Sequence, residues 1–314
     1  MTTPIAAADS ADRWYTFSVF TATYNRRHTL HRVYDSLRRQ TFRDFEWLII
    51  DDGSRDRTEE LVRCWQAEAS FSIRYLWQEN QGLNMAFNRA VREAKGELFL
   101  QFDSDNACVP EALERFKQHW DAIPDAERPQ FSGVEVLCVD QNGRSIGTRF
   151  PKDVTDSNYM EIRYRYKVKG EKWGFQRTNI LQNFPFPTLR GYIPEGLVWA
   201  AIARKFKTRF VNEELLTYWS DESDHSDRLS KLGKPAQNAP GLALWHQSVL
   251  NDHIEWFSCL PEHFLRSAAH FSRFSFHLGI GMRRQAASLT NFHAKVLWAL
   301  MLPLGLAVHR RDLR

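Results

Sequence analysis

The sequence of 314 residues has few cysteines, and no two of them form a Cys-x-x-Cys motif. The four cysteines are Cys64, Cys108, Cys138 and Cys259. This number is ordinary for the length, and the wide spacing does not indicate a disulfide framework. We therefore interpret the cysteines as reduced thiols in the core of a cytosolic protein.

Long hydrophobic runs are also missing. No stretch of about 18 consecutive apolar residues occurs, so the sequence does not predict an ordinary transmembrane helix. Residues 1–14 lack the apolar segment of a secretory signal peptide, and their small and polar residues predict a short flexible leader. These absences predict a cytoplasmic protein.

Acidic residues are absent from one long segment. None occurs between His263 and Arg311, although seven basic residues do. The chain as a whole has 42 lysines and arginines against 38 acidic residues, and a net charge of +4 is too small to indicate a nucleic-acid partner. The uneven distribution instead predicts that the C-terminal part contacts an anionic surface.

Apolar runs and helical patterns alternate through the first 120 residues. Four runs predict strands, at Phe17–Ala22, Phe45–Ile50, Ile73–Trp77 and Glu97–Phe102. The segments between them carry apolar residues at helical spacing. This alternation is typical of a parallel sheet covered by helices. We therefore predict an α/β fold with a mostly parallel central sheet and helices on both faces.

The pattern changes after residue 120. The Asn-Gly pair in 141–144 predicts a hairpin between strands at 131–139 and 145–150. Helices are predicted over 174–183 and 196–206, followed by short strands at 209–212 and 215–219. The predicted division is a leader (1–14), an N-terminal half (15–120), a second half of the same domain (121–219), a linker (220–241) and a C-terminal extension of amphipathic helices (242–314).

Three of the predicted strands end in polar residues. Thr23-Tyr24-Asn25-Arg26 follow the first strand, Asp51-Asp52-Gly53-Ser54 the second, and Asp103-Ser104-Asp105-Asn106 the fourth. Ligands of such sheets bind where the carboxyl ends of the strands meet. Carboxylates gathered there repel one another unless a cation or a hydrogen-bond donor lies between them. A divalent metal that carries phosphates would meet this need, and so would a base or ribose donor.

Four motifs in this region resemble those of a known enzyme family. They are FSVFTATYNR (17–26), YDSLRRQTFRDFEWLIIDDGSRDRT (34–58), NQGLNMAFNRAV (80–91) and AKGELFLQFDSDNACVP (94–110). In content, order and spacing they are similar to the nucleotide-binding half of family 2 glycosyltransferases. That family has the so-called A-type fold, so the resemblance implies this fold for the chain.

The resemblance implies roles for individual residues. Asp52 would contact the nucleobase, Asp103 the ribose or a metal, and Asp105 the metal, which would be Mn²⁺ or Mg²⁺. The nucleotide-sugar-binding residues implied are Thr23, Tyr24, Asn25, Arg26, Asp52, Gly82, Asp103 and Ser104. Many relatives have a basic residue in the segment that matches 83–87, and here the nearest cation is Arg89. The metal, or an arginine of the second half, would then neutralise the diphosphate.

The second half resembles the family in two segments, 173–187 and 192–219. Relatives often carry Glu-Asp at the catalytic base, and this chain has Pro194-Glu195. Matching the downstream Arg-Lys-Phe and Asn-Glu pieces implies that Glu195 is the base. The alternative interpretation is a carboxylate favoured at a helix start by the helix dipole. We expect this position to lower the pKa of Glu195.

The tail contains an apolar run of 13 residues, Val296–Val308, with basic residues on both sides. It is too short to span a bilayer but suits an interfacial segment. A helix packed on the catalytic domain, or a dimer contact, is the alternative. We predict that residues 263–314 bind anionic membranes peripherally.

The sequence therefore predicts a metal-dependent, inverting glycosyltransferase. It would move a sugar from a nucleotide-sugar donor, with a UDP-sugar as the first expectation, to a hydroxyl of a glycan or polyprenyl-linked acceptor. The expected role is cell-surface polysaccharide synthesis in the cytoplasm, at the inner face of the plasma membrane if the tail binds there.

Two alternatives remain, a second kind of enzyme and a protein without catalytic activity. A nucleotidyltransferase usually carries a glycine-rich basic loop after the first strand, and Thr23–His28 contains no glycine. A non-catalytic module that binds a nucleotide sugar or a glycan would be expected to lose the metal-binding aspartate or the base.

Overall fold

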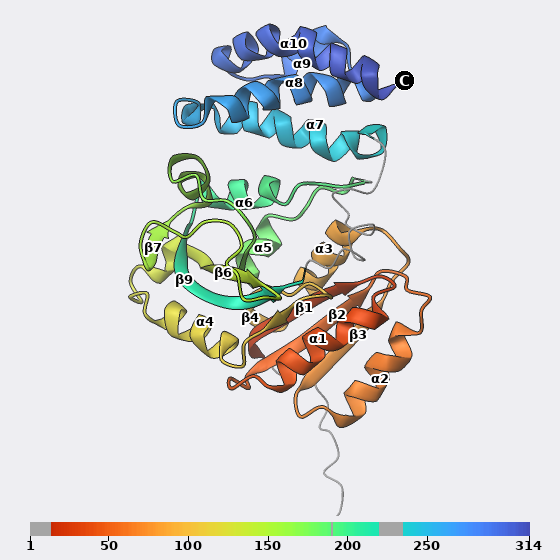
Figure 1. Cartoon of the computed structure of the whole chain (residues 1–314), viewed down its shortest axis with the longest axis vertical. Coiled ribbons are helices and arrows are strands. Elements are labelled where there is room, and N and C mark those ends of the chain that lie inside the picture. Colours follow the sequence, from red (N-terminus) through yellow and green to blue (C-terminus); the bar gives the residue numbers. More distant parts are fainter. Residues whose placement is uncertain (1–13, 190, 220–234) are drawn as a thin grey trace, which may run out of the picture.

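The structure is a computed structural model that describes residues 14–189, 191–219 and 235–314. Within these residues one nine-stranded sheet carries helices on both faces, and a separate layer of helices covers one side (Figure 1). The strand order is β3-β2-β1-β4-β8-β6-β9-β5, with β7 paired to β9. The predicted α/β fold with a mixed, mainly parallel sheet is confirmed.

The parallel part of the sheet contains the four strands that the sequence predicts. They are β1 (Tyr15–Thr23), β2 (Phe45–Asp51), β3 (Ser72–Trp77) and β4 (Gly96–Gln101), connected by α1 (Arg27–Arg38), α2 (Thr58–Glu68) and α3 (Leu83–Glu93). β1 lies between β2 and β4 and pairs with both in parallel. The register places Thr23 beside Asp51, so these strands end at the same edge.

Each face of this sheet has its own core because side chains alternate along a strand. On one face Phe17 and Trp47 pack against α1, α2 and α4 (Ala112–Asp121). On the other face Phe20 and Leu48 pack against α3, α5 (Thr178–Asn183) and α6 (Gly196–Ala203). The apolar run FEWLII is therefore buried on both sides, as expected for a central parallel strand.

The second half of the sheet differs from the prediction in three places. The predicted helix over 174–183 forms only from Thr178, as α5, because residues 174–177 belong to strand β8 (Lys172–Arg177), which pairs antiparallel with β4 and β6 and places Trp173 and Phe175 in one core. The Asn142-Gly143 turn forms, but its return segment makes a single bridge, at Ser145. The two short strands are one strand, β9 (Lys207–Tyr218), which pairs in parallel with β6 (Phe131–Asp140) through register shifts.

Short elements complete this part of the chain. They are β5 (Ala107–Cys108), β7 (Val154–Ser157), a 3-10 turn at Arg128–Gln130, a π-helical turn at Glu161–Arg165 and a 3-10 turn at Ile254–Trp256. The π-helical turn lies between the sheet and the C-terminal helices. Its residue Tyr164 is fully buried against Trp256 and Phe264.

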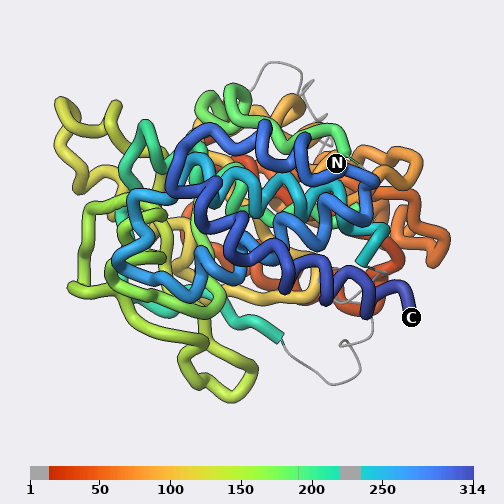
Figure 2. Tube along the Cα trace, turned by 90° about the horizontal axis from the view of Figure 1, so that it is seen from above, coloured from red at the N-terminus to blue at the C-terminus, as the bar shows by residue number. Residues whose placement is uncertain are grey.

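The C-terminal helices form a layer of their own over α6 (Figures 1 and 2). They are α7 (Pro235–Asp252), α8 (Pro261–His277), α9 (Met282–Ser288) and α10 (Phe292–Asp312). Their core includes Trp245, Phe264 and Trp298, and it reaches Ala200 of α6. The layer therefore packs on the sheet domain.

The predicted linker is wrong over residues 235–241, which belong to α7, and its remainder, 220–234, lies outside the described residues. The prediction interpreted Pro240 and Gly241 as chain breakers. Gly241 instead permits a close approach, because a Cβ there would lie 2.2 Å from the carbonyl oxygen of Tyr192. Of the predicted leader, the structure describes Trp14.

Candidate active site

The polar ends of β1, β2 and β4 meet at one edge of the sheet, as the sequence predicts. The backbone N–H of Asp52 donates to the carbonyl oxygen of Thr23 at 2.9 Å, which joins the first two ends. The N–H of Phe102 donates to the carbonyl oxygen of Phe20 at 2.8 Å, which joins the end of β4 to β1. Asp103 follows directly after this end of β4. The edge therefore gathers residues from three loops.

The carboxylate of Asp52 is buried within a set of hydrogen-bond donors. It accepts from the side-chain amide of Gln78 at 2.7 Å and from the backbone N–H groups of Gln81 at 2.9 Å and Gly82 at 2.7 Å. Gly82 precedes α3 with φ +91°, a conformation that favours glycine, and a Cβ there would meet open space. Asp52 thus orients the loop that starts α3.

Asn25 connects the loop after β1 to the loop after β2. Its N–H donates to the hydroxyl of Ser54 at 2.9 Å, and its side-chain oxygen accepts from the N–H of Arg55 at 2.8 Å. Tyr24 is half exposed at this edge, whereas Thr23 is buried. Within the described residues the buried Thr23 hydroxyl has no hydrogen-bond partner.

The loop after β4 brings together carboxylates and arginines. Asp105 lies 3.8 Å from the guanidinium of Arg26, and its carbonyl oxygen accepts from Arg32 at 2.9 Å. Ser104 is buried in the same loop. Asp103 accepts from the side-chain amide of Gln101 at 3.1 Å. Both arginines come from the loop after β1 and from α1, so this half of the chain supplies its own positive charge near Asp105.

Arg89 does not supply that charge. Its guanidinium donates to the carbonyl oxygen of Trp77 at 2.8 Å and lies 3.4 Å from the side-chain oxygen of Gln78. Both acceptors are at the end of β3, next to Asp52 and away from the Asp105 loop.

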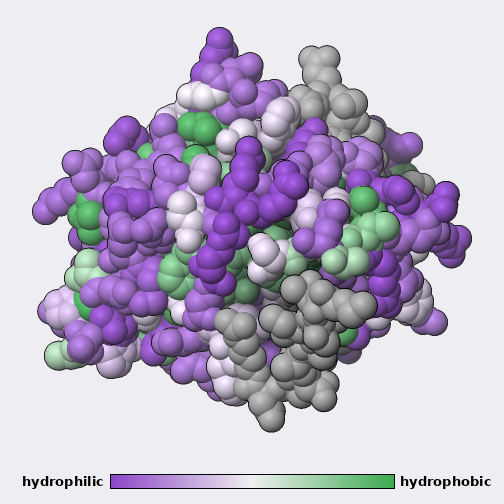
Figure 3. Space-filling model, turned by 90° about the horizontal axis from the view of Figure 1, so that it is seen from below, coloured by the Kyte–Doolittle hydropathy of each residue, from purple (hydrophilic) through white to green (hydrophobic). Residues whose placement is uncertain are grey.

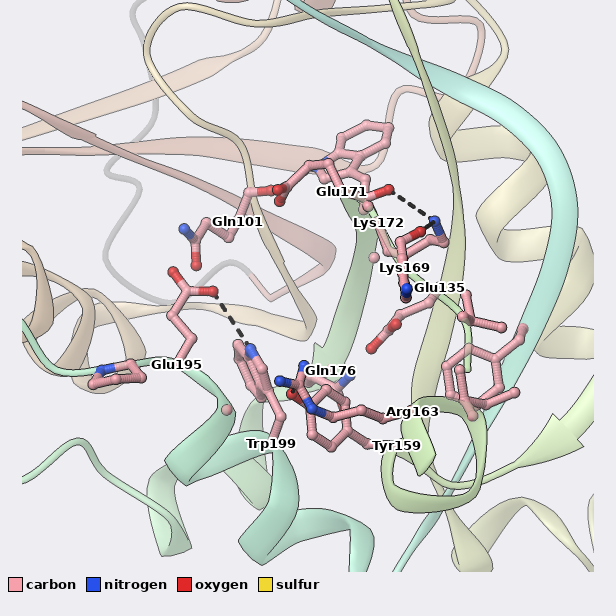
Figure 4. Close-up of a pocket in the computed structure, with 18 of the residues that line it drawn as sticks. Gln101, Glu135, Tyr159, Arg163, Lys169, Glu171, Lys172, Gln176, Glu195 and Trp199 are labelled. Carbon is pink, nitrogen blue, oxygen red and sulfur yellow. Dashed lines mark hydrogen bonds between the residues drawn. The ribbon is translucent and has the colours of Figure 1, made fainter. Parts of the chain in front are cut away.

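A cavity of about 880 Å³ extends from Asp103 toward the second half of the domain (Figure 4). Gln101, Asp103 and Glu195 line one part of it. Glu135 of β6 and Arg163 of the π-helical turn line another. The C-terminal layer contributes Trp245, Glu262, His263 and Arg266. The cavity is therefore enclosed by the parallel sheet, the second half and the C-terminal helices together.

Glu195 stands at the N-terminus of α6, where the sequence predicts it, and its side chain points into the cavity (Figure 4). The indole N–H of Trp199 donates to it at 3.4 Å. The expectation of a lowered pKa is wrong, because removal from water raises the pKa of Glu195 above its usual value, and the bonds from Trp199 and Gln101 offset only part of this.

The carboxylates of this cavity influence one another. Enclosure, followed by the nearby charge of Glu195, raises the pKa of Asp103. Enclosure likewise raises the pKa of Glu135 to about 7, although Lys172 acts in the opposite direction. The pKa of Glu171 also rises to about 7. The raised pKa values favour the protonated forms of these carboxylates, and basic side chains such as Arg163, Lys172 and Arg266 line the same cavity.

Sequence reasoning missed the far part of the cavity, which includes Glu135, Tyr159, Arg163 and Arg266. One signal was available, since Glu135 is a lone acid within the apolar strand FSGVEVLCV. The others carry no local pattern, because they meet only through the packing of distant segments.

We predict that Glu135 makes stability depend on pH. Its pKa is 4.5 in ordinary surroundings and about 7 in the folded chain, so the folded state holds an extra proton between these values. The free energy of unfolding should therefore fall as pH rises through this window. Glu135→Gln should be more stable than wild type by on the order of 1–3 kcal/mol at about pH 8 and by much less at about pH 5.

Urea unfolding of both proteins at the two pH values measures this difference. Glu127→Gln removes an exposed carboxylate and serves as the control, with no such pH-dependent gain. Equal effects of Glu135→Gln at both pH values would contradict the assignment.

Comparison with known proteins now adds to this geometry. Residues 18–153 match the family described as glycosyl transferase family 2. This range covers β1 to β4 and the three loops of the site. Residues 18–153 are a family 2 glycosyltransferase domain.

Curated relatives described as glycosyltransferases match part of this chain. An uncharacterized glycosyltransferase of Nostoc is 36% identical over 98 residues, which are 31% of this chain and 30% of the relative. This chain covers only 30%, 51% and 39% of the length of the first three curated relatives.

Two solved structures share the fold over nearly the whole chain. TarS of S. aureus, in complex with UDP-GlcNAc, gives a TM-score of 0.62 at 19% identity, covering 94% of this chain and 92% of that one. The mannosyltransferase PcManGT of Pyrobaculum calidifontis, with GDP-Man and Mn²⁺, gives 0.55 at 17% identity, covering 99% and 90%. At these identities the likeness concerns the fold, and it extends through the C-terminal part of the chain.

Proposed function

We propose that the chain is an inverting glycosyltransferase that uses a nucleotide-sugar donor. The observation that carries this proposal is the shared cavity of Asp103, which follows β4, and Glu195, which starts α6. Family 2 membership of the strands around Asp103 supports donor binding there. A carboxylate directed into the same cavity supports proton transfer beside the donor.

In this reaction Glu195 accepts the proton of an acceptor hydroxyl. The freed oxygen attacks the anomeric carbon from the side opposite the diphosphate, and the bond from that carbon to the phosphate oxygen breaks. The raised pKa of Glu195 suits a base, because it brings the group nearer to the working pH than an ordinary carboxylate. Trp199 and Trp245 line the same cavity as Glu195.

The nucleotide would lie along the loops of the parallel half, with Asp52 at the base and Thr23, Tyr24, Asn25 and Arg26 along the nucleoside. Gly82 and Ser104 complete the proposed contacts. TarS binds UDP-GlcNAc and PcManGT binds GDP-Man, so we propose a UDP-sugar first and a GDP-sugar second.

Asp105 and Asp103 fit a divalent metal by chemistry, since hard carboxylate oxygens suit Mn²⁺ and Mg²⁺. Among the described residues no group of three His, Cys, Asp or Glu side chains could hold an ion. The metal would therefore need phosphate oxygens as further ligands, and it would neutralise charge on the leaving diphosphate. Arg26 and Arg32 lie beside Asp105 and would help in the same task.

The acceptor would occupy the part of the cavity formed by Glu135, Tyr159 and Arg163 together with α7 and α8. We propose a glycan or polyprenyl-linked acceptor in cell-surface polysaccharide synthesis. A lipid-linked acceptor would place the enzyme in the cytoplasm at the inner face of the plasma membrane.

The two alternative functions are less well supported. A nucleotidyltransferase would need phosphate-binding glycines after β1, where the chain instead has Asn25 with φ +54°. A non-catalytic module would not need a carboxylate held in the cavity at the position of Glu195.

We predict that Thr23→Val weakens donor binding without weakening the fold. Removing a buried hydroxyl that has no protein partner should leave the unfolding temperature unchanged or slightly higher. Loss of its bond to the nucleotide should lower affinity by roughly tenfold. Thermal-shift titration with UDP-, GDP- and TDP-sugars and Mn²⁺ measures both quantities and identifies the donor class.

Thr21→Val is the matched control. The Thr21 hydroxyl accepts from the indole N–H of Trp47 at 3.0 Å, so this substitution should lower the unfolding temperature and leave affinity near wild type. If no donor class stabilises wild-type protein, the proposed function is wrong. If Thr23→Val binds donor as wild type does, Thr23 is not part of the site.

A further inference from the structure

Helix α10 exposes a continuous apolar stripe on the outside of the C-terminal layer. Phe292, Val296, Leu300 and Leu304 follow one another at intervals of four residues, so they share one face of the helix. Their exposed fractions are 74%, 42%, 70% and 51%. Such a row of large apolar side chains on a water-exposed helix marks an interaction surface.

The opposite face of α10 is firmly packed on α8. Leu297 and Trp298 are buried, and the Trp298 indole donates to Gln285 at 3.1 Å. Gly305 permits close contact, since a Cβ there would lie 2.5 Å from the carbonyl oxygen of Ala269. At the end of α10, Asp312 accepts from Arg273 at 2.6 and 2.8 Å.

This packing determines the orientation that α10 can take relative to a bilayer. α10 is long and apolar enough to cross a membrane by length and composition. However, its burial against α8 along its length and the anchoring of Asp312 keep it flat on the protein. Its stripe is therefore presented sideways, as in an amphipathic helix that lies in the membrane interface.

The charges around the stripe are all positive. Lys295, Arg310 and Arg311 of α10 are exposed, and so are Arg283 and Arg284 of α9. The acid of α10, Asp312, is engaged by Arg273 and His277. A symmetric contact with a second copy would place this basic rim against itself, whereas an anionic lipid surface complements it.

The opposite side of the molecule differs from this layer. Figure 3, which shows the molecule from below, is dominated by hydrophilic residues with isolated hydrophobic ones. In Figure 2, which shows it from above, α10 lies along the outside of the helical layer.

We propose that the exposed stripe of α10, with its basic rim, docks the protein flat on an anionic lipid surface. The apolar side chains enter the acyl region and the basic groups contact the headgroups. The inference is independent of the transfer reaction, because none of the stripe residues lines the cavity of Glu195.

Sedimentation with vesicles tests the proposal on the full chain. Wild-type protein should bind phosphatidylglycerol vesicles at low salt, bind phosphatidylcholine vesicles weakly, and release from the former as salt screens the charges. Leu300→Ser/Leu304→Ser should lower vesicle binding by about tenfold or more while the unfolding temperature stays near wild type. Lys295→Glu/Arg310→Glu should lower binding to the anionic vesicles.

The control variant, Trp14→Ser/Val154→Ser, removes exposed apolar side chains elsewhere and should bind as wild type does. Point substitutions are preferable to removal of α10, which would uncover Leu297 and Trp298. Failure of wild-type protein to bind anionic vesicles at low salt would overturn the proposal. Vesicle binding by Leu300→Ser/Leu304→Ser equal to that of wild type would overturn it too. A wild-type protein that is dimeric in solution, with a monomeric Leu300→Ser/Leu304→Ser variant, would also overturn it.

Discussion

Replacing Glu195 with glutamine should lower turnover by roughly 10²–10⁴-fold, the usual contribution of a positioned base. Glutamine keeps the shape and can still accept from the Trp199 indole, but it cannot take the proton of the acceptor. Donor affinity should stay near wild type. The unfolding temperature should not fall, because the cavity disfavours the charged carboxylate that is removed.

Steady-state release of nucleoside diphosphate measures this effect. Glu97→Gln removes an exposed carboxylate at the far end of β4 and is the matched control, with turnover expected to equal that of wild type. Survival of transfer within about threefold in Glu195→Gln would place the base elsewhere. The sequence offers Asp221, Glu222 and Asp224 as further candidates, and they lie outside the described residues.

The pH profile of wild-type turnover carries the same information. Because the pKa of Glu195 is raised, the acidic limb of the profile should lie above the ordinary value of 4.5 for a glutamate. Turnover should rise as pH increases through that limb, since only the ionised form accepts a proton. The limb should disappear in Glu195→Gln.

The second large effect is expected for Asp105. Asp105→Ala should lower metal-dependent donor affinity by at least about 100-fold, because it removes a proposed ligand and leaves Asp103 as the remaining carboxylate. The fold should persist, since the carbonyl oxygen of Asp105, which accepts from Arg32, is retained in the variant.

Calorimetric titration with nucleoside diphosphate, with and without Mn²⁺, provides a readout that does not depend on activity. Asp125→Ala removes an exposed carboxylate of the surface and should bind as wild type does. Unchanged metal-dependent affinity in Asp105→Ala would remove Asp105 from the metal site.

The first half of the fold could be predicted because its signals are local. Each apolar run such as FEWLII is long enough to predict a strand. The polar residues directly after these runs predict the edge of the sheet where Asp52 and Asp103 lie. Family motifs add to the same residues. The loops of the candidate donor site therefore follow from short stretches of sequence.

The second half depends on contacts between distant segments. The helix predicted over 174–183 included the last four residues of strand β8, which lead directly into α5. The pairing of β8 with β4, which ends at Gln101, far earlier in the chain, decides the outcome. Pro240 likewise lies inside α7, where Gly241 permits the close approach of Tyr192, a contact between segments that no local pattern reveals.

The chemistry of Glu195 shows the same limit. Pro194 and the residues after Glu195 predict that Glu195 lies at the start of a helix. The helix dipole alone would lower the pKa of Glu195. The cavity that raises the pKa is formed by α6, the end of β4 and the C-terminal layer together. Desolvation of this kind is a property of the assembled structure and has no local sequence pattern.

The central claim is that the loops after β1, β2 and β4 activate a nucleotide sugar beside Glu195. Its most direct test is release of nucleoside diphosphate from UDP-, GDP- and TDP-sugars by the full chain, with water in place of the acceptor. We expect Mn²⁺-dependent release from at least one donor class, lost in Asp105→Ala and strongly reduced in Glu195→Gln. No release from any donor that binds, or release that both variants retain, would contradict it.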